Sequence, residues 1–396
     1  MKTNDQPSRI LVVDDLEVNR DLLARRVQRL GHVAGFADNG QTALEQLRGS
    51  AWDLVLLDIT MPVMDGYEAL TAIKADPLLT HIPVVMVSAI DEIDSVVRCI
   101  ELGADDYLPK PFNPVILRAR IESSLAKKHL ADQKQLMLRA LSREMEIGQQ
   151  IQRGFLPERL PQLKGWDLAV RFKPARHVGG DFYDAIQLSD GRIAIAVADV
   201  CDKGVGAALY MALFRSLLRS MLLQGASGEA ATSLLQRTVG FTNDYIANEH
   251  SRDNMFATLF IGIVDVISGQ LDYINAGHEA PLLGRMNKNE YKIFEPQGLA
   301  VGMMPDIRHE VRREVIEPGD TLLVVTDGVT EAVGATGQFS DERVQALVID
   351  HNDSAENLLS KLFMQLEDHT VGYDQHDDIT VLCLHRQTDN GASISI

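Results

Sequence analysis

Between residues 9 and 123, short apolar runs rich in β-branched residues alternate with amphipathic stretches. This alternation is typical of βαβ units, which build a parallel sheet with helices on both faces. The sequence therefore predicts an α/β domain here. The expected strands are Ile10–Val13, a weaker one at His32–Ala37, Leu54–Leu57, Val84–Val87 and Tyr107-Leu108, and the expected helices are Asn19–Leu30, Gly40–Arg48, Gly66–Ala75 and Ser95–Leu102.

Polar residues close these apolar runs, and in parallel sheets ligands bind beyond the carboxyl ends of the strands. Asp58 follows a run apolar enough for a buried strand, which would fix its backbone and present its carboxylate as a nucleophile. Asp14 and Asp15 can hold Mg²⁺, while Lys110 and Ser88 can stabilise transferred oxygens. A lone Asp after a strand is more often a turn or cap residue. The five groups together favour a phosphoryl-acceptor site.

From Val115 to Phe155 the chain is almost free of Gly and Pro and rich in Leu, Lys, Glu, Gln and Ala. This composition predicts one long helix, which Pro157 and Pro161 end. A 3-4 spacing favours a weak coiled coil that joins two copies of the chain, although two of its positions are not apolar. The alternative is a solvated helix that lies on its own domains. The spaced positions are Leu138, Leu141, Met145, Gly148, Gln152 and Phe155.

From Trp166 to Arg386 the pattern changes to many strands with hairpin-like turns, interspersed with helices. Such a mixture predicts an α+β sandwich whose sheets are covered by helices. Residues 387–396 are expected to form a flexible tail. The expected strands include Ile193–Ala198, Thr258–Val266, Gln270–Asn275, Thr321–Thr326 and Thr380–His385, and the expected helices are Gly206–Gln224, Ala230–Ala247, Ser340–Asp350 and Ser354–Leu366.

Acidic residues mark four points of this second region, each at the end or turn of a strand-like segment: Asp181, Asp199, Asp327 and the pair Asp377-Asp378. Carboxylates that converge in a half-buried cleft repel one another, so bound cations are the natural reason for their coexistence. Oxygen ligands without paired His or Cys favour Mg²⁺ or Mn²⁺ over zinc. Two such ions can activate water and neutralise a phosphate without a protein nucleophile. The alternative is a set of solvated turn carboxylates.

Bulk composition limits the classes of protein that fit. A length of 396 residues favours two domains with a connector. The net charge of −18 argues against nucleic-acid binding. Three dispersed cysteines and a polar N-terminus without a signal peptide favour the cytoplasm. The most apolar helical stretch, Ala207–Leu223, carries Arg215 and Arg219, and we expect a buried helix that is too short and too charged to span a membrane.

The N-terminal third resembles the response-regulator receiver family, because VVDD, LLDITMPVMDG, VVMVSA and YLPKPF occur in that family's order and spacing. The resemblance implies a flavodoxin-like domain over residues 1–122 with a five-stranded parallel sheet. It also implies a cis peptide at Lys110-Pro111 and phosphorylation of Asp58 by a histidine kinase. The implied Mg²⁺ ligands are Asp14, Asp15, Asp58 and the carbonyl of Thr60, and the implied switch residues are Ser88, Tyr107 and Lys110.

Residues 143–386 resemble the metal-dependent protein phosphatase (PPM) family, in particular its bacterial branch of sigma-factor-regulating serine phosphatases. The motifs that carry this resemblance are EMEIGQQIQRGFLP, GGDFYD, ADVCDKGVGAALYMA, NAGHEAPLL, TDGVTEA and DDITVL. It implies a β-sandwich flanked by helices over residues 158–386, after a helical linker at 123–157. The implied ligands of two Mn²⁺ or Mg²⁺ ions are Asp181, Asp199 as the bridge, Asp327, Asp377 in preference to Asp378, and the carbonyl of Val200.

Larger members of that superfamily carry an Arg for the substrate phosphate, and no residue here clearly matches it. Arg176 is a candidate, although a surface salt bridge is the simpler interpretation. His278 follows a strand and is interpreted as a structural histidine, with a general acid as the alternative. Asp184 and Glu331 are expected to be turn residues or to support the metal ligands.

The two regions together predict a cytoplasmic, multidomain response regulator whose output domain hydrolyses phosphoserine or phosphothreonine on a protein. By the resemblance, the substrate is a phosphorylated anti-sigma-factor antagonist and the phosphodonor is a histidine kinase. Phosphorylation of Asp58 is expected to act on the metal site through the long helix. The alternative is a non-catalytic, phosphorylation-dependent adaptor that binds a sigma factor or an anti-sigma-factor system. A DNA-binding regulator is disfavoured by the charge and by the lack of a helix-turn-helix pattern.

Overall fold

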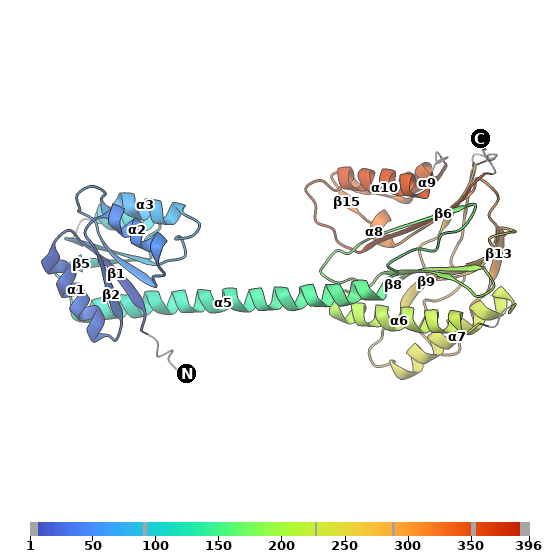
Figure 1. The fold of residues 1–396 in the computed structure, drawn as a ribbon, viewed down its shortest axis with the longest axis horizontal. Helices are drawn as coiled ribbons and strands as arrows, with labels where there is room; N and C mark the ends of the chain where they lie inside the picture. Colours follow the sequence, from blue (N-terminus) through green and yellow to red (C-terminus); the bar gives the residue numbers. More distant parts are fainter. Residues whose placement is uncertain (1–6, 90–92, 226–227, 287–289, 350–353, 389–396) are drawn as a thin grey trace, which may run out of the picture. The chain divides into compact units, whose positions relative to one another are not determined.

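The computed structural model describes residues 7–89, 93–225, 228–286, 290–349 and 354–388 (Figure 1). The chain forms two compact units, Met1–Leu141 and Ser142–Ile396, each with its own apolar core. A multidomain fold is therefore confirmed. The predicted flexible tail lies, from residue 389 onward, outside the described residues.

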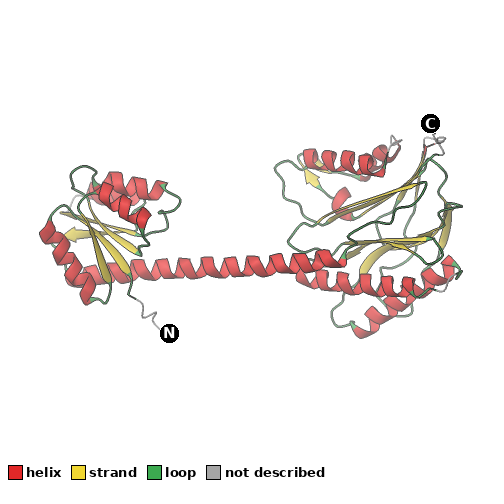
Figure 2. Ribbon diagram, viewed as in Figure 1, coloured by secondary structure: helices red, strands yellow, loops and turns green. Residues whose placement is uncertain are grey.

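The N-terminal unit is a parallel five-stranded sheet between two layers of helices (Figure 2). Its strands are β1 (Arg9–Val13), β2 (Val33–Ala37), β3 (Leu54–Asp58), β4 (Val84–Ala89) and β5 (Asp106–Lys110), and its helices are α1 (Glu17–Arg29), α2 (Gly40–Gly49), α3 (Gly66–Ala75) and α4 (Ile93–Glu101). Alternate residues of β1 pack into two different apolar cores. Leu11 and Val13 belong to one core, and Ile10 and Val12 belong to the other. The order β2-β1-β3-β4-β5 is that of flavodoxin-like folds, which confirms the predicted fold.

One helix, α5 (Pro114–Phe155), runs for 42 residues and belongs to both units. It buries Leu117, Ile121 and Leu125 in the core of the first unit. Gln152, a position of the predicted seam, is instead 6% exposed and bonds within the second unit. The predicted linker at 123–157 is thus largely part of one longer helix. Its middle carries exposed apolar side chains: Leu130, Leu136, Met137, Leu138 and Leu141.

The C-terminal unit is a sandwich of two antiparallel five-stranded sheets. One has the order β13-β10-β9-β8-β7 and the other the order β12-β11-β14-β17-β6. The strands of the first are β7 (Phe182–Gln187), β8 (Ile193–Val200), β9 (Ala257–Val264), β10 (Gln270–Ala276) and β13 (Arg312–Val315). Those of the second are β6 (Trp166–Lys173), β11 (Leu282–Arg285), β12 (Glu290–Ile293), β14 (Thr321–Val325) and β17 (Ile379–Arg386).

Helices cover both outer faces of this sandwich (Figure 1). The first sheet carries α6 (Val205–Leu223) and α7 (Ala231–Glu249), and the second carries α9 (Asp341–Ile349) and α10 (Ala355–His369). Between the sheets, side chains of both form one apolar layer, with Phe260 from the first and Leu382 from the second. The predicted α+β sandwich is therefore confirmed. The smallest elements are α8 (Asp327–Thr330), β15 (Val333–Gly334) and β16 (Gly337–Gln338).

The fold accounts for the two arginines that interrupt the apolar helix α6. Arg215 and Arg219 both pair with Asp184 of β7, at 3.0 and 2.7 Å, so one carboxylate beside the sheet offsets one of their two charges. By length and composition alone, α6 is long and apolar enough to cross a membrane, and the expectation that it is too short was wrong. In the structure, one face of it, including Met211 and Phe214, packs into the core, as expected of a buried helix.

Candidate functional site

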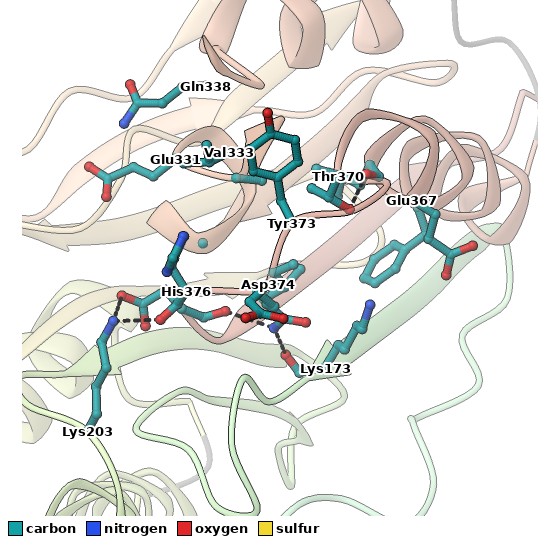
Figure 3. Close-up of a pocket in the computed structure, with 17 residues that line it drawn as sticks. Lys173, Lys203, Glu331, Val333, Gln338, Glu367, Thr370, Tyr373, Asp374 and His376 are labelled. Atoms are coloured by element: carbon teal, nitrogen blue, oxygen red, sulfur yellow. Dashed lines mark hydrogen bonds and ion pairs between the residues drawn. The ribbon is translucent and has the colours of Figure 1, made fainter. Parts of the chain in front are cut away.

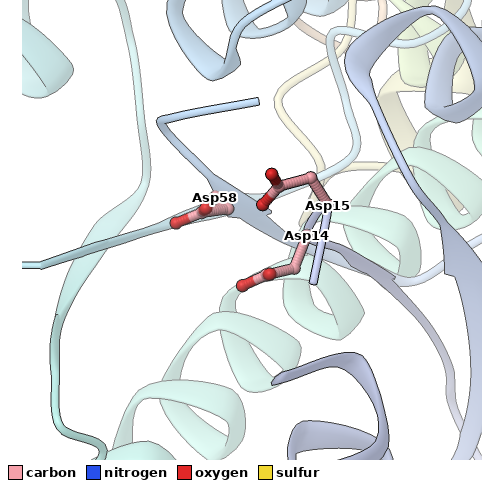
Figure 4. Close-up of side chains that lie close together, drawn as sticks. All are labelled: Asp14, Asp15 and Asp58. Carbon is pink, nitrogen blue, oxygen red and sulfur yellow. The ribbon is translucent and has the colours of Figure 1, made fainter. Parts of the chain in front are cut away.

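Three carboxylates meet at the carboxyl edge of the parallel sheet (Figure 4). Asp14 and Asp15 follow β1, and Asp58 ends the neighbouring strand β3. One carboxylate oxygen of each residue lies within 4.8 Å of the other two. Oxygen ligands at this spacing suit Mg²⁺. The structure thus brings together three of the predicted acceptor-site residues.

Lys110 supplies the positive charge at this edge. Its Nζ lies 2.7 Å from Oδ1 of Asp58 and 2.8 Å from Oδ2 of Asp14. Burial raises the pKa of Asp58, and the hydrogen bond from Lys110 opposes that shift. Asp58 is therefore a desolvated carboxylate whose charge depends on cationic neighbours, as a phosphoryl acceptor requires.

The other predicted residues of this edge lie close by. Ser88 is half buried near the end of β4, in a segment paired with β5. Tyr107 of β5 is also half buried and packs against one of the two cores. Thr60 is exposed in the loop after β3. The Lys110-Pro111 peptide is cis, as the resemblance implies.

The loop after Asp58 is fixed by a glycine and a helix cap. A Cβ atom at Gly66 would meet the carbonyl oxygen of Asp58 at 2.2 Å, so only glycine lets α3 begin this close to β3. Asp65 accepts the N–H of Glu68 at 2.8 Å, and Glu68 accepts the N–H of Asp65. Val63, which lies between β3 and Asp65, has a φ of 73°, which a β-branched residue rarely adopts.

Four further carboxylates lie at the ends of strands in the sandwich, two from each sheet. Asp181 directly precedes β7 and Asp199 lies near the end of β8, and these strands pair. Asp327 begins α8 directly after Thr326, which follows β14, and Asp377 lies just before β17, which pairs with β14. Hydrogen bonds from Thr326 and Thr380 to Asp181 join the two sheets at this point.

Asp181 connects the two sheets. Its Oδ2 accepts a hydrogen bond from Oγ1 of Thr326 at 2.8 Å and another from Oγ1 of Thr380 at 2.6 Å. The residue is 1% exposed. Burial raises its pKa well above the usual range, and repulsion from Asp199 adds to the shift. Burial and this repulsion both disfavour the charged form of Asp181, so a bound cation would stabilise its carboxylate.

Asp199 and Asp327 also lie in surroundings where a bound cation would stabilise their charged forms. Burial raises the pKa of Asp199 to about 7, with repulsion from Asp327 as the next cause. Burial also raises the pKa of Asp327, whose buried Oδ1 has no hydrogen-bond partner among the described residues. Crowded, desolvated carboxylate oxygens fit Mg²⁺ or Mn²⁺. Among the described residues, no three of these carboxylates have oxygens all within 4.8 Å of one another.

Asp378 has a different environment from Asp377. Its Oδ1 accepts the N–H of Ala175 at 2.8 Å and its Oδ2 accepts the N–H of Gly180 at 2.7 Å. Asp377 instead pairs with Lys203 at 2.6 Å. Because both oxygens of Asp378 hold the loop before β7, its placement argues against Asp378 as a metal ligand and for Asp377.

Two glycines in that loop permit close contacts on two sides. A Cβ atom at Gly180 would meet the carbonyl oxygen of Val200 at 2.7 Å, and one at Gly179 would meet the carboxylate of Asp378 at 2.3 Å. The amide of Gln152 donates to the carbonyl of Gly179 at 2.5 Å and accepts its N–H at 3.1 Å. Helix α5 therefore holds the loop that carries Asp181.

A cavity of about 430 Å³ opens beside Asp377 (Figure 3). Phe363 and Leu366 of α10 give it apolar lining, and Lys173 and Lys203 contribute ammonium groups. Its position next to a candidate metal ligand makes it the natural place for a substrate group.

The remaining predicted residues lie apart from this chemistry. Arg176 is exposed and has no ion pair among the described residues, so the expected salt bridge is absent there. His278 is 2% exposed, bonds Oγ1 of Thr258 through Nδ1 at 2.9 Å, and has a pKa that burial lowers to about 3. This burial and this contact support the interpretation of His278 as a structural histidine. Asp184 forms ion pairs with the arginines of α6. Glu331 follows α8 and lines the cavity.

Sequence reasoning did not single out Gln152, Lys203, Thr326 or Thr380 as functional. Thr326 directly precedes Asp327, and Thr380 follows the Asp377-Asp378 pair by two positions. In the sequence, Gln152 is recognisable only as a polar residue within the predicted coiled-coil spacing. Thr326, Thr380 and Lys203 could have been found because each is a polar residue close in sequence to a predicted acidic ligand.

These features define a receiver domain followed by a domain of the metal-dependent phosphatase type. Residues 10–122 match the model of the response regulator receiver domain, and residues 189–387 match that of Stage II sporulation protein E (SpoIIE). The chain thus belongs to the SpoIIE family and carries a receiver domain.

Known proteins share one or both parts. The chain is 34% identical to Protein IcfG of Synechocystis sp., over 95% of this chain and 58% of that protein. It is 27% identical to Phosphoserine phosphatase RsbU of Bacillus subtilis, over 62% of this chain and 70% of that protein. The SiaA-PP2C domain of Pseudomonas aeruginosa superposes with a TM-score of 0.55 at 22% identity, over 63% of this chain and 98% of that domain, and shares its fold.

Proposed function

We propose that this chain is a metal-dependent protein phosphatase, controlled by its receiver domain, that hydrolyses phosphoserine and phosphothreonine. The observation that carries the proposal is the group of desolvated, mutually repelling carboxylates that includes Asp181, Asp199 and Asp327. Such a group requires cations, and hard divalent ions beside a cavity suit metal-assisted hydrolysis of a phosphate ester. The likeness to Phosphoserine phosphatase RsbU supports the same activity.

In the proposed site, Asp199 would hold two Mn²⁺ or Mg²⁺ ions together with the other proposed ligands. Bound there, these ions would neutralise the phosphate and activate water for in-line attack. Thr326 and Thr380 orient one of the ligands, and Asp378 holds its loop. The proposed ligands are Asp181, Asp199, Asp327, Asp377 and the carbonyl of Val200.

The receiver would accept a phosphoryl group on Asp58 from a histidine kinase. Mg²⁺ held by Asp14, Asp15 and the carbonyl of Thr60 would neutralise the acceptor. Lys110, which contacts Asp58 at 2.7 Å, would stabilise the transferred oxygens.

Helix α5 is the proposed route from the receiver to the metal site. Ser88 and Tyr107 would repack on phosphorylation and change the contacts of α5. At its other end Gln152 holds Gly179, so a shift of the helix would move the loop of Asp181. The exposed apolar residues of α5 support pairing with a second copy of the chain.

The proposed substrate is an anti-sigma-factor antagonist phosphorylated on serine or threonine, as the resemblance to sigma-factor-regulating phosphatases implies. Incubating the chain with candidate phosphorylated antagonists, with and without a small-molecule phosphodonor, tests both substrate and control. Asp58→Ala should abolish the response to the phosphodonor. An unchanged response would contradict control through Asp58.

Mn²⁺-dependent hydrolysis of p-nitrophenyl phosphate tests the activity itself. Asp199→Asn should lower turnover by about 100-fold or more, about 2.7 kcal/mol of barrier, because the bridging carboxylate is lost. Glu356→Gln is the control, since this exposed carboxylate pairs with Arg171 on α10 and β6. Absence of Mn²⁺-dependent turnover in the native chain, on this ester and on phosphorylated proteins, would leave a non-catalytic adaptor.

A further inference from the structure

Lys203 lines the cavity and lies beside Asp377 (Figure 3). Its Nζ pairs with Oδ2 of Asp377 at 2.6 Å and donates to the carbonyl of His376 at 2.8 Å. The side chain is 41% exposed, so the ammonium group also faces open space. The positive charge of Lys203 therefore lies beside a candidate metal ligand, Asp377, and at the edge of the cavity that a substrate can enter.

The backbone around Lys203 turns sharply. Asp202 and Gly204, on either side of it, both have left-handed conformations, with φ of 73° and 86°. Oδ1 of Asp202 accepts the N–H of Lys203 at 2.8 Å, and α6 begins immediately afterwards at Val205. This turn directs the lysine across to the segment before β17 instead of along α6.

The charges around the cavity make this lysine distinctive. Among the described residues that line the cavity, Lys173 and Lys203 carry ammonium groups. Of these two, only Lys203 pairs with a candidate metal ligand, Asp377. Arg176, the candidate from the sequence, does not line the cavity. A phosphate that enters beside Asp377 needs a cation of the protein to balance carboxylates such as Glu331 and Asp374.

We infer that Lys203 binds the phosphate group of the substrate, in the role that an arginine has in larger members of the superfamily. The inference rests on the proposed function and names a residue that contacts its substrate. If Asp377 held a divalent ion, the ammonium group of Lys203 would be free to pair with an anion in the cavity. Lysine suits this role because it binds phosphate as a compact point charge on a flexible stem.

The test uses the full chain loaded with Mn²⁺ and compares Lys203→Met, Lys203→Arg and Lys173→Met. Three quantities are measured: the Kd of inorganic phosphate by calorimetry, KM and kcat for p-nitrophenyl phosphate, and the Kd of Mn²⁺. Lys203→Met should raise the phosphate Kd and KM by about 10-fold or more, the range for a lost hydrogen bond to a charged group. Lys203→Arg should restore most of the affinity. Lys173→Met removes the other ammonium group of the cavity and should raise both values less than Lys203→Met does, because Lys173 forms no ion pair with Asp377 among the described residues.

An unchanged phosphate Kd in Lys203→Met would overturn the inference, as would an equal effect of Lys173→Met. A change confined to the Kd of Mn²⁺ would also overturn it, because Lys203 would then act only on the metal site. Phosphate binding is measured without turnover. A chain that binds phosphate through Lys203 but hydrolyses no ester would therefore support this inference and contradict only the proposed function.

Discussion

Asp377 and Asp378 are neighbours in the chain, yet their side chains have different partners. One pairs with Lys203 beside the cavity, and the other holds the backbone of Ala175 and Gly180. Both oxygens of Asp378 accept hydrogen bonds from that backbone, whereas Asp377 lines the cavity. From the sequence alone, Asp377 and Asp378 are equivalent candidates for the metal ligand. What distinguishes them is the loop of Ala175 and Gly180, which binds Asp378 and lies about 200 positions away in the chain.

Val63 stores strain next to the acceptor site. Its φ of 73° is unfavourable for a β-branched residue, and its side chain is 84% exposed, so little packing compensates. Val63→Gly should therefore stabilise the receiver by about 0.5–1 kcal/mol, after the entropic cost of glycine is subtracted. Urea unfolding followed by the fluorescence of Trp52, in a Trp166→Phe background, measures this change.

Val18→Gly is the matched control for this prediction. Val18 is 78% exposed but lies in α1, where glycine should destabilise by about 0.5–1 kcal/mol. Equal losses in both variants would show that Val63 is not strained.

Among the elements, those with strong local signals were predicted well. Gly66–Ala75 has the predicted bounds, because its cap and periodicity lie within the segment itself. Strand β6 was not predicted, since charged residues interrupt its apolar pattern, and it forms by pairing along its whole length with β17. The four-residue strands β12 and β13 lie at sheet edges with largely exposed side chains, where sequence carries little pattern.

The contact between α5 and the glycine loop gives a prediction at this scale. Gln152→Ala would leave the N–H and carbonyl of Gly179 buried without these partners, and should destabilise the C-terminal unit by about 2 kcal/mol. It should also weaken Mn²⁺ binding, because the loop of Asp181 loses an anchor. Urea unfolding followed by Trp166 in a Trp52→Phe background and calorimetry with Mn²⁺ measure the two effects. Gln150→Ala, on the exposed side of the same helix, should change stability by less than about 0.5 kcal/mol.

For the whole molecule, the roles of the acidic residues as metal ligands stay predictions. The sequence predicted both folds and the positions of these residues near strand ends, because each follows or precedes a recognisable strand. It did not predict the partners that fix them. Thr380 and Asp181 are 199 positions apart, and Gln152 and Gly179 are 27 apart and belong to different elements. Such contacts depend on how two sheets and a helix pack, which no local pattern encodes.

The buried carboxylates make the stability of the metal-free chain depend on pH. The raised pKa values of Asp181, Asp199 and Asp327 mean that the folded state holds protons that the unfolded state releases. Their contribution is complete below about pH 4 and is lost as the pH rises through about 7, where Asp199 titrates. In EDTA, the Tm of the C-terminal unit should fall by several degrees between about pH 5 and pH 8, at roughly 2–4 °C for each kcal/mol.

Mn²⁺ should reverse this trend, since cations replace the protons and stabilise most where the carboxylates are ionised. The rise in Tm on adding Mn²⁺ should therefore be larger at about pH 8 than at about pH 5. Asp199→Asn should flatten the profile in EDTA, because its amide does not titrate. An EDTA profile that rises with pH would show that these carboxylates are not desolvated.

The end of helix α5 makes the second unit sensitive to the length of that helix. Each residue added to an α-helix turns everything beyond it by about 100°, whereas seven residues turn it by only about 20°. One residue inserted just before Gln152 would therefore turn this side chain away from Gly179, whereas a whole heptad would restore its direction. The helix that enters the second unit should accordingly tolerate changes of length only in steps close to whole heptads.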